Sequence, residues 1–270
     1  MLEMRYAREE DINSLKELYL ACFDEKPEAV ELFFERIFKP ENCYVCIDGG
    51  ELIAMVHFLP TKLNGRDARY LYAAATKEEF RGTGIMDGLV KAALSMYAPE
   101  VCVTLPADEH LYNYYRRFKF KEMTVNVATL GREEALSLSK PYDEQENVVG
   151  GYCGIRNRVL KDNFLFWNNN HIDFAFDYYS LYGGIIIKNN YGYAIAVEEN
   201  GVCEVLEFIC ADENSPYLLS DLLSQTDCEQ LRLRLSPNQK FFDSKPEKFA
   251  MARFATRYEP DFIYSGLTLD

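Results

Sequence analysis

One segment sets the architecture of this 270-residue chain: Ala73-Ala-Ala-Thr-Lys-Glu-Glu-Phe-Arg-Gly-Thr-Gly-Ile-Met86. It predicts a strand that runs through a short loop directly into a helix. At such a junction, unpaired backbone N–H groups and the positive end of the helix dipole converge on one spot. Gly82 and Gly84 remove the Cβ atoms that would block a close approach, and Arg81 adds a fixed positive charge. The pattern indicates an anion site of pyrophosphate size, with a purely structural turn as the alternative.

The elements around this segment predict a mixed sheet of the α/β class. Strand Arg69–Thr76, helical apolar spacing over 85–97 and strand Val101–Leu105 form a strand–helix–strand unit, which requires parallel strands and a right-handed crossover. Upstream, Cys43–Ile47 and Glu51–Leu59 flank a glycine turn and predict an antiparallel hairpin. The first half is completed by an expected strand at Met4–Ala7, helices that begin near Asp11 and Pro27, helix Glu109–Arg117 and strand Lys121–Leu130.

The second half repeats this order of elements. We expect helices at Ile155–Trp167 and Ile172–Leu181, strands at Ile185–Lys188, Tyr191–Val197 and Val202–Cys210, helix Pro216–Leu223 and strand Leu231–Leu235. The polar stretch Gly131–Val149 has no apolar period and is interpreted as a linker. The sequence therefore predicts an internal structural repeat, with domains at 1–130 and 150–270 on either side of the linker 131–149.

Composition excludes several classes of protein. With 48% hydrophobic and 27% charged residues, the chain has the composition of a globular protein and differs from disordered or fibrous chains. The net charge of −14 repels phosphate backbones, so we expect no nucleic-acid partner. No apolar run approaches the ~20 residues of a membrane span, and no signal peptide is evident. We expect a soluble cytoplasmic protein with no membrane partner.

The eight cysteines predict neither a disulfide framework nor a metal site. Most lie among apolar, strand-like neighbours, where a thiol packs as a small hydrophobe. Cys43 and Cys46 form a C-x-x-C pattern, but on a strand an offset of three points the two sulfurs to opposite faces. No second Cys or His pair lies at ligand spacing, so we expect no metal.

Two motifs give the chain a resemblance to a known family. Arg81-Gly-Thr-Gly-Ile-Met86 matches the Arg/Gln-x-x-Gly-x-Gly/Ala signature after the fourth strand, with Met86 in place of the small sixth residue. Downstream, Tyr114-Tyr-Arg-Arg-Phe-Lys-Phe120 matches an aromatic-Tyr-x-x-Phe/Leu-Gly-Phe run, with Lys119 in place of the glycine. The chain in these motifs resembles the GNAT superfamily of acyl-CoA N-acyltransferases.

The resemblance implies acetyl-CoA as co-substrate and a set of site residues. The cofactor would be held by Ala74, Ala75, Thr76, Arg81, Gly82, Thr83, Gly84, Ile85 and Met86. Tyr115 falls where many members place the tyrosine that protonates the departing thiolate. Asp108 is the candidate base that we retain, since it begins the Tyr115 helix near the expected cleft, although such a residue often serves as a helix cap. Glu109, His57 and His110 are the other candidates, and His110 begins the same helix as Asp108.

The tandem order of elements is similar to that of the enhanced intracellular survival acetyltransferases, without their C-terminal sterol-carrier-like domain. In the second half, the connector Ala211–Ser215 lacks glycine and carries two acidic residues, so we expect a degenerate domain and one acyl-CoA site per chain. The implied activity is transfer of an acetyl group to a primary amine of a small molecule, for which the acidic charge favours a cationic acceptor. A non-catalytic acyl-CoA-binding or partner-binding module with a decayed site is the alternative, and a homo-oligomer is left open.

Overall fold

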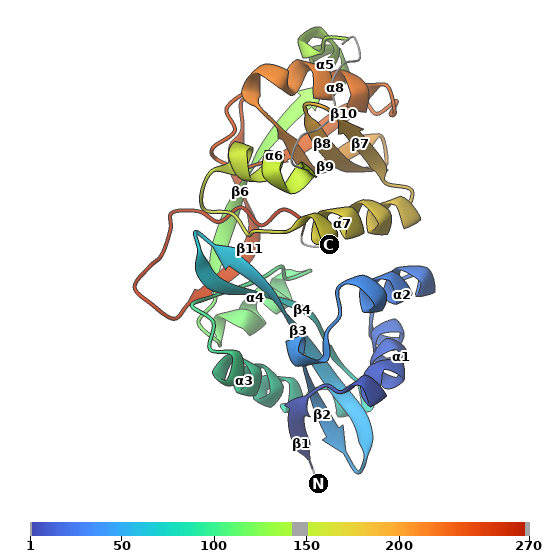
Figure 1. Ribbon diagram of the computed structural model, residues 1–270, viewed down its shortest axis with the longest axis vertical. Helices are drawn as coiled ribbons and strands as arrows, with labels where there is room; N and C mark the ends of the chain where they lie inside the picture. Colours follow the sequence, from blue (N-terminus) through green and yellow to red (C-terminus); the bar gives the residue numbers. More distant parts are fainter. Residues whose placement is uncertain (1, 142–150, 268–270) are drawn as a thin grey trace. The chain divides into compact units, whose positions relative to one another are not determined.

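The structure is a computed structural model that describes residues 2–141 and 151–267 (Figure 1). The chain divides into two compact units. Unit 1 comprises Met1–Glu122 and Met251–Glu259, and unit 2 comprises Met123–Ala250 and Pro260–Asp270. Each unit combines helices with strands of a mixed sheet, which confirms the predicted α/β class.

Unit 1 contains the predicted meander and strand–helix–strand unit. Its elements are β1 (Glu3–Tyr6), α1 (Ile12–Cys22), α2 (Pro27–Arg36), β2 (Cys43–Asp48), β3 (Glu51–Leu63), β4 (Arg66–Thr76), α3 (Ile85–Tyr97), β5 (Val101–Thr104) and α4 (Glu109–Arg116), with short 3-10 turns η1 (Glu9–Asp11), η2 (Pro40–Asn42) and η3 (Glu78–Phe80). The strand order is β1-β2-β3-β4-β5, followed by part of a strand near the C-terminus. The β4–β5 pair is parallel and the other pairs of this unit are antiparallel.

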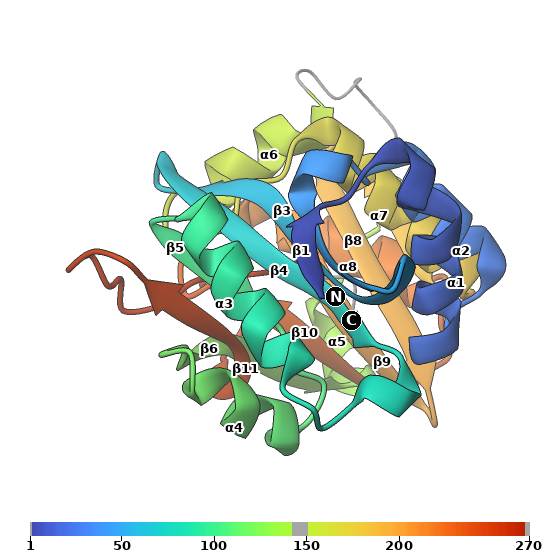
Figure 2. The same ribbon diagram turned by 90° about the horizontal axis from the view of Figure 1, so that it is seen from below.

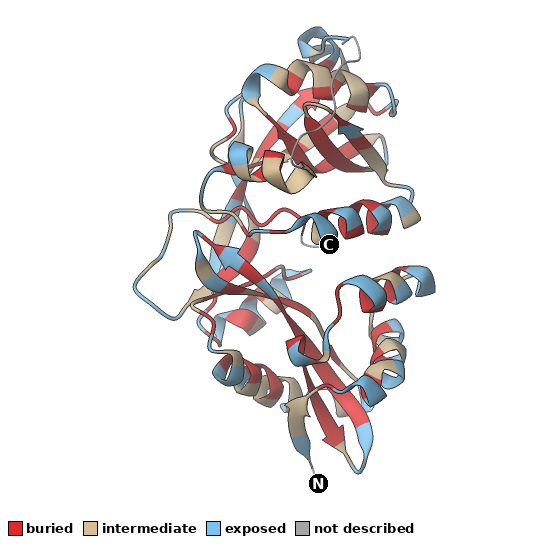
Figure 3. Cartoon of the chain, in the orientation of Figure 1, coloured by how far each residue is buried: buried red, intermediate tan, exposed pale blue. Residues whose placement is uncertain are grey.

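Helices cover both faces of the unit 1 sheet, with α1 and α2 on one side and α3 and α4 on the other (Figures 1 and 2). On the α3–α4 side, Phe58, Leu71, Leu89 and Cys102 belong to one buried apolar cluster. On the other side, His57 packs edge-on against Phe33 of α2, with ring centroids 5.3 Å apart. Strands β2, β3 and β5 are accordingly buried along most of their length, while the outer helix faces are exposed (Figure 3).

Unit 2 repeats these pairings. Its elements are α5 (Arg132–Leu138), α6 (Gly151–Leu160), α7 (Asn169–Leu181), β7 (Ile185–Asn189), β8 (Gly192–Glu199), β9 (Val202–Cys210), η4 (Asp212–Asn214), α8 (Ser215–Leu223) and β10 (Gln230–Leu235), together with most of β6 (Lys121–Gly131). The order β7-β8-β9-β10-β6 has one parallel pair, β9–β10, as unit 1 has in β4–β5.

The domain boundaries differ from the expected 1–130 and 150–270. Strand β6 was expected to complete the first domain, but Asn126–Gly131 pairs with β10 inside unit 2. Conversely, Met251–Phe254, the end of β11 (Lys245–Phe254), pairs with β5 inside unit 1. Each unit is thus completed by a strand from the other half of the sequence. A strand pattern carries no information on which edge the strand joins, and β11 itself was not predicted.

Two further expectations need correction. Within the expected linker 131–149, residues Arg132–Leu138 form helix α5, and 142–150 lie outside the described residues. The sequence did not predict helix α5, because Ala135 is its one buried residue and its sequence has little apolar periodicity. The expected helix Ile155–Trp167 ends at Leu160.

The cysteines are free thiols, and both Cys43 and Cys46 are buried in β2. None of the helices formed by residues 2–141 and 151–267 is long and apolar enough to cross a membrane.

The contribution of β11 to unit 1 predicts a stability effect far from the N-terminal half in sequence. Met251 is fully buried in the same apolar cluster as Leu89 and Tyr115. Met251→Ala should lower the free energy of unfolding by about 2–5 kcal/mol, because it removes buried contacts and leaves a cavity. Urea unfolding followed by circular dichroism measures this. The control is Met96→Ala, since Met96 is 54% exposed; equal midpoints for the two variants would contradict the assignment.

Candidate functional site

The central feature of unit 1 is the separation of β4 from β5. The two strands pair in parallel from Ala68↔Val101 to Leu71↔Thr104, where β5 ends. Strand β4 continues to Thr76, still paired with β3 on its other edge. The last part of β4 therefore presents an edge that β5 does not pair.

A bulge in β4 lies at the point of separation. Its register against β3 shifts between Met55 and His57, so that Ala73 and Ala74 lie opposite the single residue Val56. Ala73 has φ of 45°, a left-handed conformation that is rare for a residue with a side chain. Such bulges bend a strand and redirect its backbone groups. The bulge thus turns the Ala74–Thr76 backbone away from the line of β5.

Beyond Thr76, the chain reaches α3 through η3 and the predicted glycine loop. Gly82 and Gly84 have φ of 74° and 84°, and Gly84 is the N-cap of α3. A Cβ added at either glycine would meet no atom within 4 Å, so the backbone conformation and not the packing requires glycine here. The first-turn N–H groups of α3 lack intrahelical acceptors, as at any helix start. The loop therefore offers backbone donors beside open space.

A cavity of about 330 Å³ lies on this loop. Its walls are formed by Thr76, Phe80, Arg81, Gly82, Gly84, Ile85, Met86, Asp87, His110, Tyr114 and Arg117. Six of the nine predicted cofactor-binding residues are among them; Ala74, Ala75 and Thr83 are not. We call this space the loop cavity.

Arg81 is held back toward the end of β4. Its Nε donates to the Thr76 carbonyl at 3.1 Å, and its Nη2 lies 3.6 Å from the Cys22 sulfur. Thr83 does not face the loop cavity, and its Oγ1 donates to the Phe80 carbonyl at 2.6 Å. These bonds fix the loop before any ligand is present.

Tyr115 is buried and lies at the point where β4 and β5 separate. Its side chain is 6% exposed, and burial raises its pKa to about 12, partly offset by a hydrogen bond with Thr104. The Thr104 hydroxyl donates to the Leu71 carbonyl at 3.1 Å, and Leu71 is the last residue of β4 that pairs with β5. Tyr115 therefore belongs to the apolar core and contacts Thr104 at the end of β5, but it is not among the residues that line the loop cavity.

Tyr114 and Arg117, the C-cap of α4, line the loop cavity and were not predicted as site residues, whereas His110, which also lines it, was named as a candidate base. His110, Tyr114 and Arg117 follow one another at i, i+4 and i+7, which places them on one helical face. The adjacent positions 111, 115 and 118 belong to the buried cluster or pack against it. This helical phase is the sequence signal that could have found them. Burial raises the pKa of Tyr114 above its usual range, and the nearby Asp87 carboxylate raises it further.

The predicted acidic residues of α4 lie outside the loop cavity. Asp108 is the N-cap of α4, and its Oδ1 accepts from Leu111 N at 2.8 Å. Glu109 forms an ion pair with Arg116 at 3.3 Å. His57, another candidate base, is fully buried among aromatic rings, and burial lowers its pKa to about 4.

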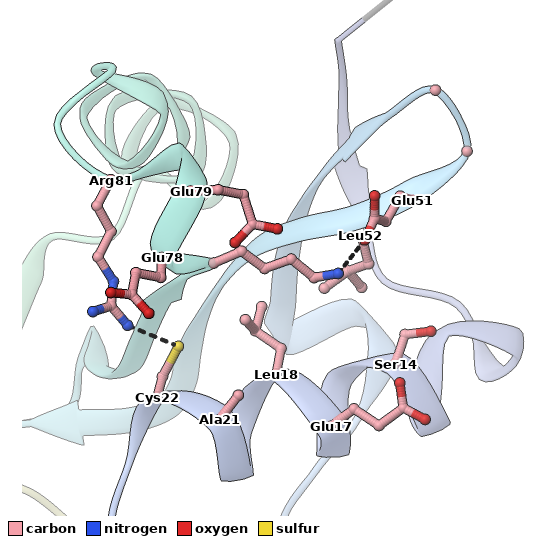
Figure 4. A pocket seen from close by; sticks show the side chains of 13 residues that line it. Ser14, Glu17, Leu18, Ala21, Cys22, Glu51, Leu52, Glu78, Glu79 and Arg81 are labelled. Atoms are coloured by element: carbon pink, nitrogen blue, oxygen red, sulfur yellow. Dashed lines mark hydrogen bonds and ion pairs between the residues drawn. The ribbon is translucent and has the colours of Figure 1, made fainter.

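A second cavity, of about 880 Å³, lies between α1, the β2–β3 turn and η3 (Figure 4). We call it the acidic cavity, because four glutamates line it, against Lys77 and Arg81 as cations. The four are Glu17, Glu51, Glu78 and Glu79. Lys77 is paired with Glu51, and Arg81 lines both cavities. No group of three or more His, Cys, Asp or Glu side chains within the described ranges could hold a metal ion.

In unit 2, a side chain bonds the backbone groups that correspond to the edge of β4 that β5 does not pair in unit 1. Its parallel pair β9–β10 ends at Val205↔Leu233. Beyond that point, the Gln239 side chain donates to the Phe208 carbonyl at 2.6 Å and accepts from Ser236 N at 2.9 Å. Gln239 is 1% exposed, so its amide replaces a missing strand partner inside the core.

The helix start of unit 2 also differs from that of unit 1. The chain reaches α8 through η4, whose first turn contains Asp212 and Glu213. Pro216 lies in the first turn of α8, where it removes a backbone donor. Two carboxylates and one missing N–H make this helix start a poor anion site.

Comparisons with known proteins agree with this geometry. Residues 3–123 match the family model described as an acetyltransferase (GNAT) domain. A search of curated proteins finds no match to the chain.

Several solved structures share the fold. A GCN5-related N-acetyltransferase from Anabaena variabilis has a TM-score of 0.70 at 13% identity, over 95% of this chain and 73% of that one. One from Kribbella flavida has a TM-score of 0.64 at 14% identity, over 94% and 72%. Eis1 from Mycobacterium abscessus has a TM-score of 0.64 at 8% identity, over 93% and 73%. At these identities the likeness is one of fold. Residues 3–123 thus match the model of a GNAT acetyltransferase domain, and the solved structures show a GNAT-like fold that extends across the chain.

Proposed function

We propose that the protein is an N-acetyltransferase that moves an acetyl group from acetyl-CoA to a primary amine, with unit 1 catalytic and unit 2 degenerate. The observation that carries the proposal is the unpaired end of β4, which leads directly into a glycine-capped helix start. An extended amide-containing arm that ends in a pyrophosphate matches both features, because one supplies strand-like backbone groups and the other supplies anion donors.

In this proposal the phosphates of CoA bind the loop from Arg81 to Gly84 and the first turn of α3. Ile85 and Met86 supply N–H groups there, and Thr83 stabilises the loop through its bond to Phe80. The pantetheine arm lies along Ala74, Ala75 and Thr76 as an added strand. Thr76 Oγ1 is buried without a hydrogen-bond partner within the described part of the chain, and an amide of the arm would satisfy it.

The chemistry needs an amine in its neutral form, since the lone pair attacks the thioester carbonyl. As the tetrahedral intermediate forms, a backbone N–H of the β4 bulge stabilises its oxyanion. The C–S bond then breaks, the CoA thiolate leaves, and the ammonium proton passes to solvent. Tyr115 donates its proton to the departing sulfur, so that CoA is released as the thiol, and the phenolate regains a proton from solvent. A pKa of about 12 keeps this phenol protonated at every working pH.

Asp108 remains our candidate for relaying the proton of the amine. Its cap hydrogen bond engages Oδ1, which leaves Oδ2 for an incoming donor. Because direct attack requires only a route for the proton to water, this role is secondary to that of Tyr115.

One observation favours the alternative of a non-catalytic acyl-CoA-binding module. Tyr115 is 6% exposed and hydrogen-bonded to Thr104, as a purely structural core tyrosine would be. Release of free thiol from acetyl-CoA in the presence of a library of amines separates the two functions.

The first test concerns cofactor binding. Gly84→Glu should abolish CoA binding, because it places bulk and negative charge at the phosphates and strains a residue with φ of 84°. The matched control is Gly65→Glu in the β3–β4 turn, where φ is 79° and the surrounding space is equally open. Calorimetry should give one site per chain for the parent and for Gly65→Glu. Two sites, or undiminished binding by Gly84→Glu, would contradict the proposal.

The second test concerns Tyr115. Tyr115→Phe should lower kcat by roughly 10²–10⁴ with little change in the KM for acetyl-CoA, as expected when a proton donor is lost without loss of binding. Tyr112→Phe is the control, since Tyr112 lies in the same helix and is also 6% exposed. Since the pKa of Tyr115 is raised to about 12, its proton is lost only near that pH. In the parent, kcat/KM should therefore rise with pH as the acceptor amine deprotonates, without a falling limb below about pH 11.

The third test concerns the acceptor, which we propose to be a cationic small molecule such as a polyamine. The carboxylates of the acidic cavity support this, because a cleft of one sign concentrates oppositely charged ligands. Glu78→Gln with Glu79→Gln should lower kcat/KM for spermidine by about 2- to 5-fold at low salt and weaken its dependence on salt. The control pair is Glu133→Gln with Glu134→Gln in α5, two adjacent exposed carboxylates. Equal effects of both pairs on kcat/KM would contradict a specific role of the acidic cavity in binding the acceptor.

A further inference from the structure

The loop cavity contains an internal anion in addition to its cations. Asp87 lies in the first turn of α3, the position that a helix dipole makes favourable for negative charge. Its Oδ1 accepts from Arg117 Nη2 at 2.9 Å. A carboxylate of the same chain thus already occupies one guanidinium of the proposed anion site.

Arg117 is positioned for a second role. Its guanidinium lies 4.6 Å above the Tyr114 ring, and its Nε is 3.4 Å from the Tyr114 carbonyl. The side chain is 56% exposed and lines the loop cavity. Stacking fixes the plane of the guanidinium while leaving its forked donors available for a phosphate.

We propose that Asp87 and Arg117 form an internal ion pair that a CoA phosphate replaces, so that Arg117 is a phosphate-binding residue whose affinity Asp87 restrains. The inference rests on the proposed function. A phosphate that enters the cavity meets the backbone N–H groups of the helix start and the side chains of Arg81 and Arg117. It competes with Asp87 for Arg117. The exchange is between two salt-bridge partners of one guanidinium and requires no movement of the fold.

The competition predicts coupling between the two residues. Asp87→Asn should tighten CoA binding by about twofold to fivefold, the range of a partly exposed ion pair. Arg117→Gln should weaken binding by at least the same factor. If Asp87 acts by withholding Arg117, the gain from Asp87→Asn should largely vanish in the Arg117→Gln background. If Asp87 acts only by repelling phosphate, the gain should persist unchanged there.

Calorimetric titration of the four proteins of this cycle with CoA decides between these outcomes. Glu100→Gln is the matched control, because Glu100 forms a pair with Arg66 in the same unit at 2.8 Å and similar exposure; its CoA affinity should equal that of the parent. Thermal unfolding of each variant checks that the fold is retained. The same titrations with 3′-dephospho-CoA show which phosphate Arg117 binds. If the coupling between Asp87→Asn and Arg117→Gln persists, Arg117 binds the pyrophosphate. If the coupling disappears, Arg117 binds the 3′-phosphate.

The results also separate this inference from the proposed function. A parent that binds no CoA refutes the function and the inference together. A parent that binds CoA with an additive cycle, or with unchanged affinity in Asp87→Asn, overturns the inference and leaves the function standing.

Discussion

The early end of β5 is the constraint on which the candidate site depends. Had β5 continued beyond Thr104, its backbone would have paired with the end of β4 and closed the opening. Instead β4 carries a bulge at Ala73, at a cost in backbone strain that only surrounding pairings can sustain. Those pairings are with β3, which holds Ala75 and Thr76 in register. One short strand and one bulge thus expose backbone groups that a compact protein would otherwise satisfy internally.

The two units show opposite solutions to the same problem. Both contain a parallel strand pair that ends early and leaves backbone groups unpaired. Unit 2 satisfies them with the Gln239 amide, and it also buries the ion pair of Arg156 and Glu207, to which the Tyr193 hydroxyl donates at 2.5 Å. Such a network is costly to break, because removal of one partner leaves a buried charge without compensation. Unit 2 therefore has a satisfied core at this position, whereas in unit 1 the edge of β4 beyond Leu71 is not paired by β5.

Local features of the fold and site were predictable, and long-range ones were not. The glycine loop, the strand before it and the helix after it follow from spacing and turn chemistry within about twenty residues. The role of β11 depends on pairing between Met251 and Thr104, far apart in the sequence, for which no local signal exists. The phase of α4 lies between these cases. A helical wheel separates Tyr114 from Tyr115, but only the packed core shows which of the two faces the cavity.

The net charge of −14 does not oppose the binding of an anionic cofactor, because charges act locally. Exposed charges farther apart than the Debye length of ~8 Å are largely screened at physiological salt. Within that range, the loop cavity combines a helix N-terminus with Arg81 and Arg117, while the acidic cavity combines four glutamates with one paired lysine. Arg81 lines both cavities, so these two sets of charges lie next to each other. Under the proposed function, the loop cavity would hold the anionic donor and the acidic cavity a cationic acceptor, each beside charges of the opposite sign.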